Sequence, residues 1–357
     1  MAALGEEWDE LAALYGTPFL RHAWFSAFWA AFAGGAELRV AVLRRDGRLD
    51  GVFPLFGSGR SWRALANPHS QIFSPLARDE AALRELAVAV VGTTGELEVW
   101  ALPTEWPALG ALRTVATNAG RIAFAERLHT SPIVELNGDF ATYHAGLGKG
   151  TRRWLGKALR RLRDEHDDVQ FELVSEPSDA GAELEEGFAL EAAGWKGRDG
   201  TAILSKPETA QFFRALGLAL HDDGVLRLSR LRVDGRLAAF ELQAVDGRRL
   251  WSLKGAYDES LRRYSPGLLL RIAVIERAFE LGLETNELLG FDSDFKLKFA
   301  NASRSHCVFR AYERTAPSVA RYLYRRRVRP AAKHAYLRFG GLRARIAIQR
   351  ALVRLRS

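Results

Sequence analysis

The sequence predicts an α/β (α+β) protein of two tandem modules, each a mixed, largely antiparallel sheet flanked by helices. Three observations lead to this prediction. At 357 residues and 48% hydrophobic composition, the chain can bury two sizeable cores. Alternating apolar and polar runs are joined by Asp-Gly turns, which is typical of antiparallel hairpins. Longer runs with apolar residues every three or four positions separate these hairpins and indicate helices.

The first module is predicted to span residues 1–138 and to begin with two helices between residues 5 and 33. An aromatic stripe at helical spacing in the second helix favours core packing over a ligand cage. The members of this stripe are Trp24, Phe25, Phe28, Trp29 and Phe32. A hairpin of strands 38–45 and 49–56 then surrounds Asp46-Gly47. The remaining elements are expected at residues 79–91, 96–102, 107–119 and 133–136.

The second module is predicted to span residues 139–315. A basic segment at 139–166 joins the halves and leads to a strand at 169–174. Two helices follow at 179–194 and 207–221. The rest of the module is expected as strands 225–233, 237–245 and 249–257 with Asp-Gly turns between them, helix 267–282, strand 286–291 and a return strand at 306–312.

A basic tail is predicted at residues 316–357, where twelve basic and no acidic residues occur, leaving 39 basic against 43 acidic residues before it. Apolar residues alternate with these charges, a pattern typical of a segment that lies on an anionic membrane surface. Packing of this segment against the acidic body is the interpretation that is favoured slightly over membrane contact. Nucleic acid is not an expected partner, because no interleaved aromatic and basic platform for RNA is visible.

The cysteine count and the N-terminal residues indicate the cellular compartment. Cys307 is the only cysteine, so a disulfide within the chain is excluded and a reducing compartment is favoured. The first ten residues lack the basic and apolar regions of a secretory signal, and no run of about 18 apolar residues occurs. These features predict a cytoplasmic protein, peripheral to the inner face of the cell membrane if the tail binds lipid. The scattered histidines predict no metal site.

A glycine-bearing loop precedes the helix at 267–282. Free N–H groups at a helix start, together with the helix dipole, suit a phosphate. Arg262 or Arg263 would supply positive charge next to Ser265. Backbone amides for the phosphate are expected from Gly267, Leu268 and Leu269. An ordinary helix start with proline is the alternative interpretation.

The order of motifs resembles the CelD-like and FemABX-like branch of the GNAT superfamily over roughly residues 8–312. The loop Arg262-x-x-Ser265-x-Gly267 is similar to the pyrophosphate loop of that superfamily, with serine in place of its first glycine. Further matches are Glu191-Ala-Ala-Gly-Trp195-Lys196-Gly197, Lys254-Gly-Ala-Tyr257-Asp258, and Asp292 with Lys296. The resemblance implies acyl transfer from acetyl-CoA, or another acyl-CoA, to an amine on a small molecule, glycan or peptide, in polysaccharide or cell-envelope biosynthesis.

Three carboxylates are candidates for the base that deprotonates the amine. Glu241 lies within an apolar strand, where a carboxylate needs a partner or has a raised pKa. Asp258 and Asp292 stand at strand ends, where catalytic groups and ordinary turn residues both occur. Asp292 is favoured because it matches the family pattern together with Lys296.

Seven residues are candidate substrate contacts. Glu191 and Trp195, four apart on a predicted helix, are expected to share a face. Lys149, Arg152 and Arg153 could meet an anionic acceptor, or form a solvated helix face. The last two candidates are Lys254 and Lys296.

Two other functions remain open. The FemABX relatives imply transfer of an aminoacyl group from tRNA to a cell-wall peptide. Serine at position 265 also leaves open a non-catalytic scaffold in a glycan-synthesis complex.

Overall fold

The computed structural model describes residues 4–328, which divide into two compact units. Among the described residues, the first unit contains residues 4–34 together with His129–Arg304. The second contains Gly35–Leu128 together with residues 305–328. This division differs from the predicted boundaries after residues 138 and 315, because the N-terminal helices belong to the unit formed by the second half of the chain.

Aromatic packing explains why the N-terminal segment belongs to the first unit. The segment forms α1 (Gly5–Ala13), η2 (Pro18–Leu20) and α2 (His22–Phe32). The ring of Trp24 lies 5.4 Å from that of Phe212, and the ring of Phe19 lies 5.8 Å from that of Trp251, both measured between centroids. Trp24, Phe25 and Phe28 of the aromatic stripe are buried, which confirms their predicted core role, whereas Trp29 and Phe32 are partly exposed.

The sheet of the first unit has the strand order β6-β11-β10-β9-β8-β7. β10 and β11 are parallel, and the other neighbours are antiparallel. This agrees with the predicted meander of strands joined by Asp-Gly turns. The strands are β6 (Ile122–Glu135), β7 (Val169–Ser175), β8 (Leu226–Val233), β9 (Arg236–Asp246), β10 (Arg249–Tyr257) and β11 (Thr285–Glu287).

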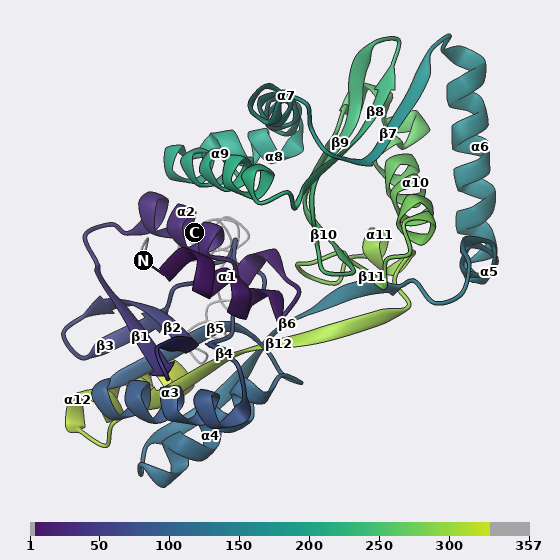
Figure 1. The fold of residues 1–357 in the computed structure, drawn as a ribbon. Helices are drawn as coiled ribbons and strands as arrows, with labels where there is room; N and C mark the ends of the chain where they lie inside the picture. Colours follow the sequence, from purple (N-terminus) through teal and green to yellow (C-terminus); the bar gives the residue numbers. More distant parts are fainter. Residues whose placement is uncertain (1–3, 329–357) are drawn as a thin grey trace. The chain divides into compact units, whose positions relative to one another are not determined.

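Helices cover both faces of this sheet (Figure 1). α7 and α9 pack on one face, against β8, β9 and β10, and α10 packs on the other. α6 lies outside α10 and closes a core that includes Leu155, Leu162 and Leu270. The helices are α5 (Phe140–Gly146), α6 (Lys149–Glu165), α7 (Ala180–Ala193), α8 (Trp195–Arg198), α9 (Pro207–Asp222), α10 (Pro266–Glu280) and α11 (Asp294–Leu297), with short η3 (Ile203–Ser205) and η4 (Glu259–Tyr264).

The second unit repeats one feature of the first, a strand, a helix and a parallel strand. Its strand order is β1-β2-β3-β5-β12, and β3 and β5 are parallel around α3, as β10 and β11 are around α10. The predicted class of two modules with mixed, largely antiparallel sheets is therefore confirmed. The elements are β1 (Glu37–Arg45), β2 (Arg48–Ser58), β3 (Ser61–Ala64), β4 (Leu76–Ala77), α3 (Glu80–Thr93), β5 (Glu96–Pro103), α4 (Pro107–Asn118) and β12 (Ala302–Tyr312).

The start of the basic tail folds back on the second unit. It forms α12 (Ala316–Leu323) and a π-helical turn, η5 (Tyr324–Val328). Arg321 lies 2.9 Å from Glu96, and Arg325 lies 2.6 Å from Glu98, both measured between nitrogen and oxygen. The rest of the predicted tail, residues 329–357, lies outside the described residues, and its contact with a membrane stays a prediction.

No helix within residues 4–328 is both long and apolar enough to cross a bilayer. Within the same range, no three or more His, Cys, Asp or Glu side chains come together as a metal site.

Gly187 tests the packing of α7 on β9. A Cβ added at Gly187 would lie 2.3 Å from the ring of Phe240, whereas one added at Gly156, on α6, would meet nothing within 4 Å. Gly187→Ala should therefore lower the free energy of unfolding by about 1–3 kcal/mol. Gly156→Ala should raise it by about 0.5–1 kcal/mol, because alanine favours a helix. Urea denaturation measures both, and equal effects would contradict the close packing.

Candidate functional site

The two parallel strands of the first unit separate soon after they meet. β10 pairs with β11 only over Arg249–Trp251 and Thr285–Glu287, whereas β10 continues to Tyr257. Positive φ angles at Leu289 (54°) and Gly290 (62°) turn the chain away after β11. The strand predicted at 286–291 is therefore much shorter, and the edge of β10 beyond Trp251 is left without pairing to β11.

The register of β10 shows which groups face this open edge. The amide of Asp258 donates to the carbonyl of Ala238, while Tyr257 lies opposite Ala239. Tyr257, and Gly255 two residues before it, are thus non-hydrogen-bonded positions with respect to β9. Their backbone groups point toward the side that β11 leaves open. A register shift between Ser252 and Lys254 adds a bulge at the same place.

Helix α10 begins beside the far end of this open edge. Ser265 has a left-handed conformation (φ 53°), no side chain caps the helix, and its first turn contains no acidic residue. A Cβ added at Gly267 would lie 3.4 Å from the side chain of Tyr257 on β10. The positive end of the helix dipole is therefore next to the open strand, in an arrangement that suits a phosphate.

The amides of this helix start are used differently from the prediction. Leu268 and Leu269 both donate to the carbonyl of Ser265, at 2.9 and 3.1 Å. Because Pro266 has no N–H group, Gly267 has the first-turn amide that these bonds leave for a ligand.

The two arginines of the loop also differ in their surroundings. Arg263 makes an ion pair with Glu165 at 2.6 Å, and its guanidinium lies over the ring of Tyr264. Arg262 is exposed. The carboxyl whose charge Arg262 is known to affect is that of Glu259. Hydrogen bonding from Arg198, and then from the amide of Trp195, lowers the pKa of Glu259, and the charge of Arg262 makes a smaller contribution in the same direction. Arg262 is therefore the better placed of the two to meet a ligand.

Lysines gather at the open edge of β10. Lys196 donates to Glu191 and to the carbonyl of Gly255, both at 2.7 Å. Burial lowers the pKa of Lys254 to about 8, and the charge of Lys196 adds to this effect. Lys296 donates to the carbonyl of Leu289; burial, followed by the charges of Arg271 and Lys196, lowers its pKa to about 8.

Glu191 and Trp195 do not share a helix face, so that expectation is wrong. α7 ends at Ala193, and the extended conformation of Gly194 (ψ −167°) separates it from α8. As a result Glu191 is buried, whereas Trp195 is 47% exposed. Glu191 holds Lys196, and the indole of Trp195 can contact a ligand from the surface.

Glu241 belongs to a buried network rather than to the open edge. It lies 2.9 Å from Arg271 of α10 and accepts a hydrogen bond from Gln243 at 2.8 Å. Its partner is therefore Arg271 of α10; Lys254, on the neighbouring strand, lies opposite Leu242. Burial raises the pKa of the Glu241 carboxyl, while Arg271 opposes that shift.

The two aspartates occupy different positions. Asp258 caps η4, since its carboxylate accepts the amide of Ser260 at 2.8 Å. Asp292 is exposed in the loop after β11. Burial, followed by the charge of Lys296, lowers the pKa of His129 to about 4, and the charge of Asp292 opposes this shift. The charges of Asp292 and Lys296 thus both reach His129.

His129 was missed by the sequence analysis, because only the pairing of β6 with β11 brings it to the loop. Arg271 was also missed, because only the packing of α10 on the sheet brings it to Glu241. Neither has a local sequence signal that marks it as part of a site.

The three basic residues of α6 occupy its first two turns. Lys149 and Arg153 are exposed, whereas Arg152 donates to the carbonyl of Leu147 at 3.1 Å. Their contact with an anionic acceptor stays a prediction.

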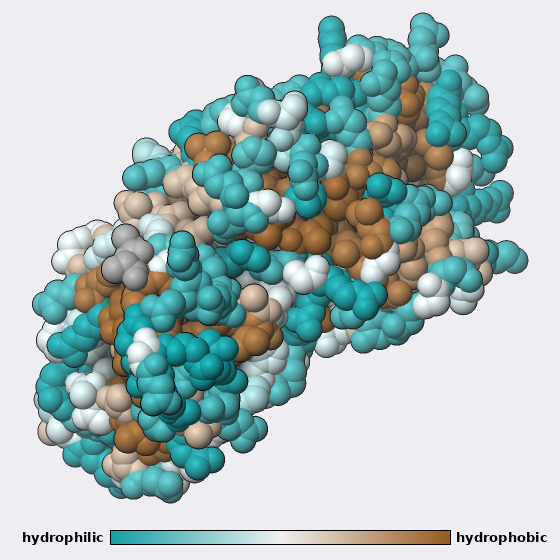
Figure 2. Space-filling view, viewed as in Figure 1, coloured by the Kyte–Doolittle hydropathy of each residue, from teal (hydrophilic) through white to brown (hydrophobic). Residues whose placement is uncertain are grey.

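Apolar surface also borders the open strand. Figure 2 shows brown side chains exposed over the region where Figure 1 draws β10. Phe291, in the loop that follows β11, is 58% exposed, and Phe295, on α11, is 46% exposed. Such a surface can contact an uncharged, flexible part of a ligand, for example a chain that links a phosphate to a reactive group.

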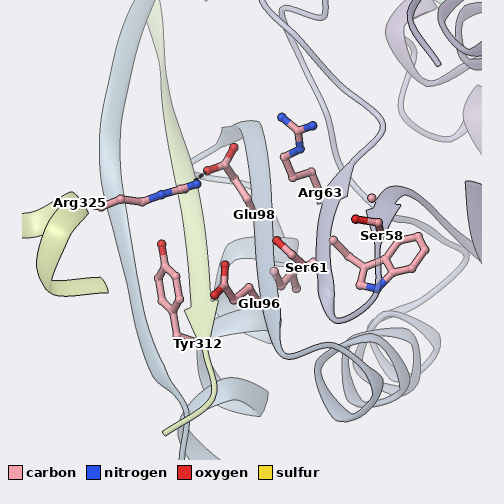
Figure 3. A pocket seen from close by; sticks show the side chains of 10 residues that line it. Ser58, Ser61, Arg63, Glu96, Glu98, Tyr312 and Arg325 are labelled. Atoms are coloured by element: carbon pink, nitrogen blue, oxygen red, sulfur yellow. Dashed lines mark hydrogen bonds and ion pairs between the residues drawn. The ribbon is translucent and has the colours of Figure 1, made fainter. Parts of the chain in front are cut away.

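A polar pocket of about 230 Å³ lies in the second unit (Figure 3). Arg325 reaches Glu98 at its mouth, and Arg310 also holds Glu98, at 2.7 Å. Burial acts to raise the pKa of the Glu98 carboxyl, but the charges of Arg310 and Arg325 together outweigh it and hold that pKa below its usual range. The carboxylates that line this pocket are therefore engaged by arginines and are poorly suited to act as an acid or a base.

Comparisons with known proteins agree with this geometry. A family model described as an acetyltransferase (GNAT) domain matches residues 149–297, which include the open strand and the start of α10. No curated protein matches the chain.

Solved structures resemble nearly the whole chain. FemX has a TM-score of 0.57 at 14% identity, covering 85% of this chain and 93% of FemX. A C-terminal domain assigned to a lysylphosphatidylglycerol synthetase from Agrobacterium fabrum has a TM-score of 0.56 at 16% identity, covering 90% and 96%. L-PGS from Bacillus licheniformis has a TM-score of 0.51 at 14% identity, covering 84% and 95%. At such identities these matches show the fold. Residues 149–297 thus match the GNAT domain, and the whole chain has a fold similar to that of FemX.

Proposed function

We propose that this protein is an acyl-CoA-dependent N-acyltransferase whose site lies in the first unit. The observation that supports this most strongly is the separation of β10 from β11 beside the start of α10. A helix start binds the pyrophosphate, and the open strand edge provides backbone partners for the amides of the pantetheine arm. The thioester then lies near the bulge at Ser252 and Lys254.

The second unit lacks the corresponding helix start. Asp79 caps the start of α3, since its carboxylate accepts the amide of Ala82 at 2.6 Å, and Glu80 follows in the first turn. A carboxylate already occupies this helix end and would repel a phosphate. This difference favours one donor site for each chain, at α10.

Acyl transfer requires three events at the site. The acceptor nitrogen must lose a proton, a C–N bond must form at the thioester carbonyl, and the C–S bond must break with the proton passing to the leaving thiolate. Asp292 is assigned the removal of the proton, since it is exposed in the loop after β11 and its charge reaches His129. The ammonium of Lys296 is assigned the stabilisation of the oxyanion.

We propose that the acyl group is acetyl and that the acceptor is an amine. Acetyl is the simplest group that fits a GNAT domain, and an amine of a polysaccharide or cell-envelope precursor is the acceptor class that the family resemblance implies. Aminoacyl transfer from tRNA is the alternative, and direct measurements with CoA separate the two.

Gly267→Val tests the donor site. A side chain at this position presses on Tyr257 and blocks the close approach of a phosphate, so the Kd of CoA should rise at least tenfold. Gly150→Val is the matched control, because Gly150 is the second residue of α6 and a Cβ there meets nothing within 4 Å. Calorimetric titration with CoA measures both. Equal affinity in the two variants would move the donor site elsewhere.

Asp292→Asn tests the assigned base. The amide cannot accept the proton, so kcat should fall about 100-fold while the Kd of CoA stays unchanged. Asp294→Asn, an exposed change two residues further on, at the start of α11, should leave kcat as in the wild type. Steady-state release of free thiol from acetyl-CoA measures this. Full activity of Asp292→Asn would transfer the role of base to another group or to water.

The pH profile tests Lys296. Because the pKa of Lys296 is lowered to about 8, its ammonium is present below that pH and is lost as pH rises through it. An oxyanion needs the charged form, so kcat should decline above about pH 8. Lys296→Met should lower kcat and remove this alkaline decline. An unchanged alkaline limb in the variant would assign the titration to a different group.

A further inference from the structure

Two lysines at the open edge of β10 share a single carboxylate. Glu191, which is 4% exposed, accepts the ammonium of Lys196 through one oxygen and the amide of Ile203, at 2.7 Å, through the other. Its charge also acts on Lys254, raising that pKa against the effect of burial. Both oxygens of Glu191 therefore have partners before Lys254 is considered.

Lys254 has no acceptor of its own. Its Nζ lies 4.9 Å from the centre of the Phe213 ring, and within residues 4–328 no hydrogen bond or ion pair joins it to another group. A partly buried ammonium without an acceptor is costly, even above an aromatic ring. With its pKa at about 8, Lys254 is mainly charged at neutral pH, so this cost is present in the working protein.

The backbone places this charge at the reactive end of the proposed donor site. The register shift between Ser252 and Lys254 sets the side chain on the face of β10 that α7 and α9 cover. The adjacent Gly255 carbonyl, at the open edge, is held by Lys196. The cluster of Glu191, Lys196 and Lys254 therefore lies where an acyl group and its acceptor would meet, with one positive charge in excess.

We propose that Lys254 and Lys196 form a subsite for a carboxylate of the substrate. This inference rests on the proposed function and deepens it. One excess positive charge is balanced by a singly charged carboxylate, whereas a dianionic phosphate would reverse the sign of the cluster. The carboxylate comes either from the acyl group, as in a dicarboxylic acid thioester, or from the acceptor, as in an amino acid or the C-terminal residue of a peptide.

Two binding comparisons distinguish the sources. The first measures the Kd of succinyl-CoA against that of butyryl-CoA, which has the same chain length without the charge. The second measures, on protein saturated with CoA, the Kd of glycylglycine against that of glycylglycine amide. Each is made with the wild type, with Lys254→Met, and with Lys157→Met, an exposed lysine on α6 that serves as control.

The charged ligand should bind about tenfold tighter than its neutral twin in one of the comparisons. Lys254→Met should abolish that preference, and Lys157→Met should keep it. A preference in the first comparison assigns the carboxylate to the acyl group, and one in the second assigns it to the acceptor. No preference in either, or a preference that persists in Lys254→Met, overturns the inference.

Two further measurements, CoA binding by the wild type and the melting temperature of Lys254→Met, distinguish loss of the subsite from loss of the proposed function and from a structural role of Lys254. If the wild type does not bind CoA itself, the proposed function fails, whereas CoA binding without a carboxylate preference removes the subsite alone. The melting temperature of Lys254→Met should be equal to or above that of the wild type, since the variant removes an ammonium without an acceptor. A lower melting temperature with an unchanged preference would make Lys254 a structural residue.

Discussion

The limited pairing of β10 with β11 is the constraint on which the candidate site depends. Three residues of each strand pair, and then the left-handed backbone at Leu289 and Gly290 directs the chain away. Full pairing would have used the carbonyl of Gly255 within the sheet. Instead, the carbonyl of Gly255 accepts a hydrogen bond from Lys196, and the rest of this edge can pair with a ligand. The same divergence releases the loop that positions Asp292 and Lys296.

The two units show how one arrangement of strand, helix and parallel strand can differ in chemistry. The decisive difference lies at the helix starts. Asp79 caps α3 with its own carboxylate, so the positive end of that helix is neutralised from within. α10 begins at Ser265 with no capping side chain, which leaves its dipole for a ligand. In the second unit, arginines engage the acidic side chains, as Arg325 does for Glu98, and those carboxylates stabilise the fold.

Elements set by local rules could be predicted from the sequence, and those set by distant contacts could not. The Asp-Gly turns placed most strands of both meanders, because turn chemistry acts within four residues. The length of β11 was predicted wrongly, since the backbone at Leu289 is decided by the surrounding fold. Sequence spacing also placed Glu191 and Trp195 on one helix, which Gly194 interrupts. His129 joined the site through strand pairing alone.

Amide hydrogen exchange with and without CoA tests most directly the claim that the open strand and the start of α10 form one donor site. Bound CoA should slow exchange at residues 252–257 and at Gly267, since the ligand would use those backbone groups. Exchange in α3 should stay unchanged, because Asp79 occupies that helix start. Slowed exchange at α3, with none at β10 and α10, would contradict the account.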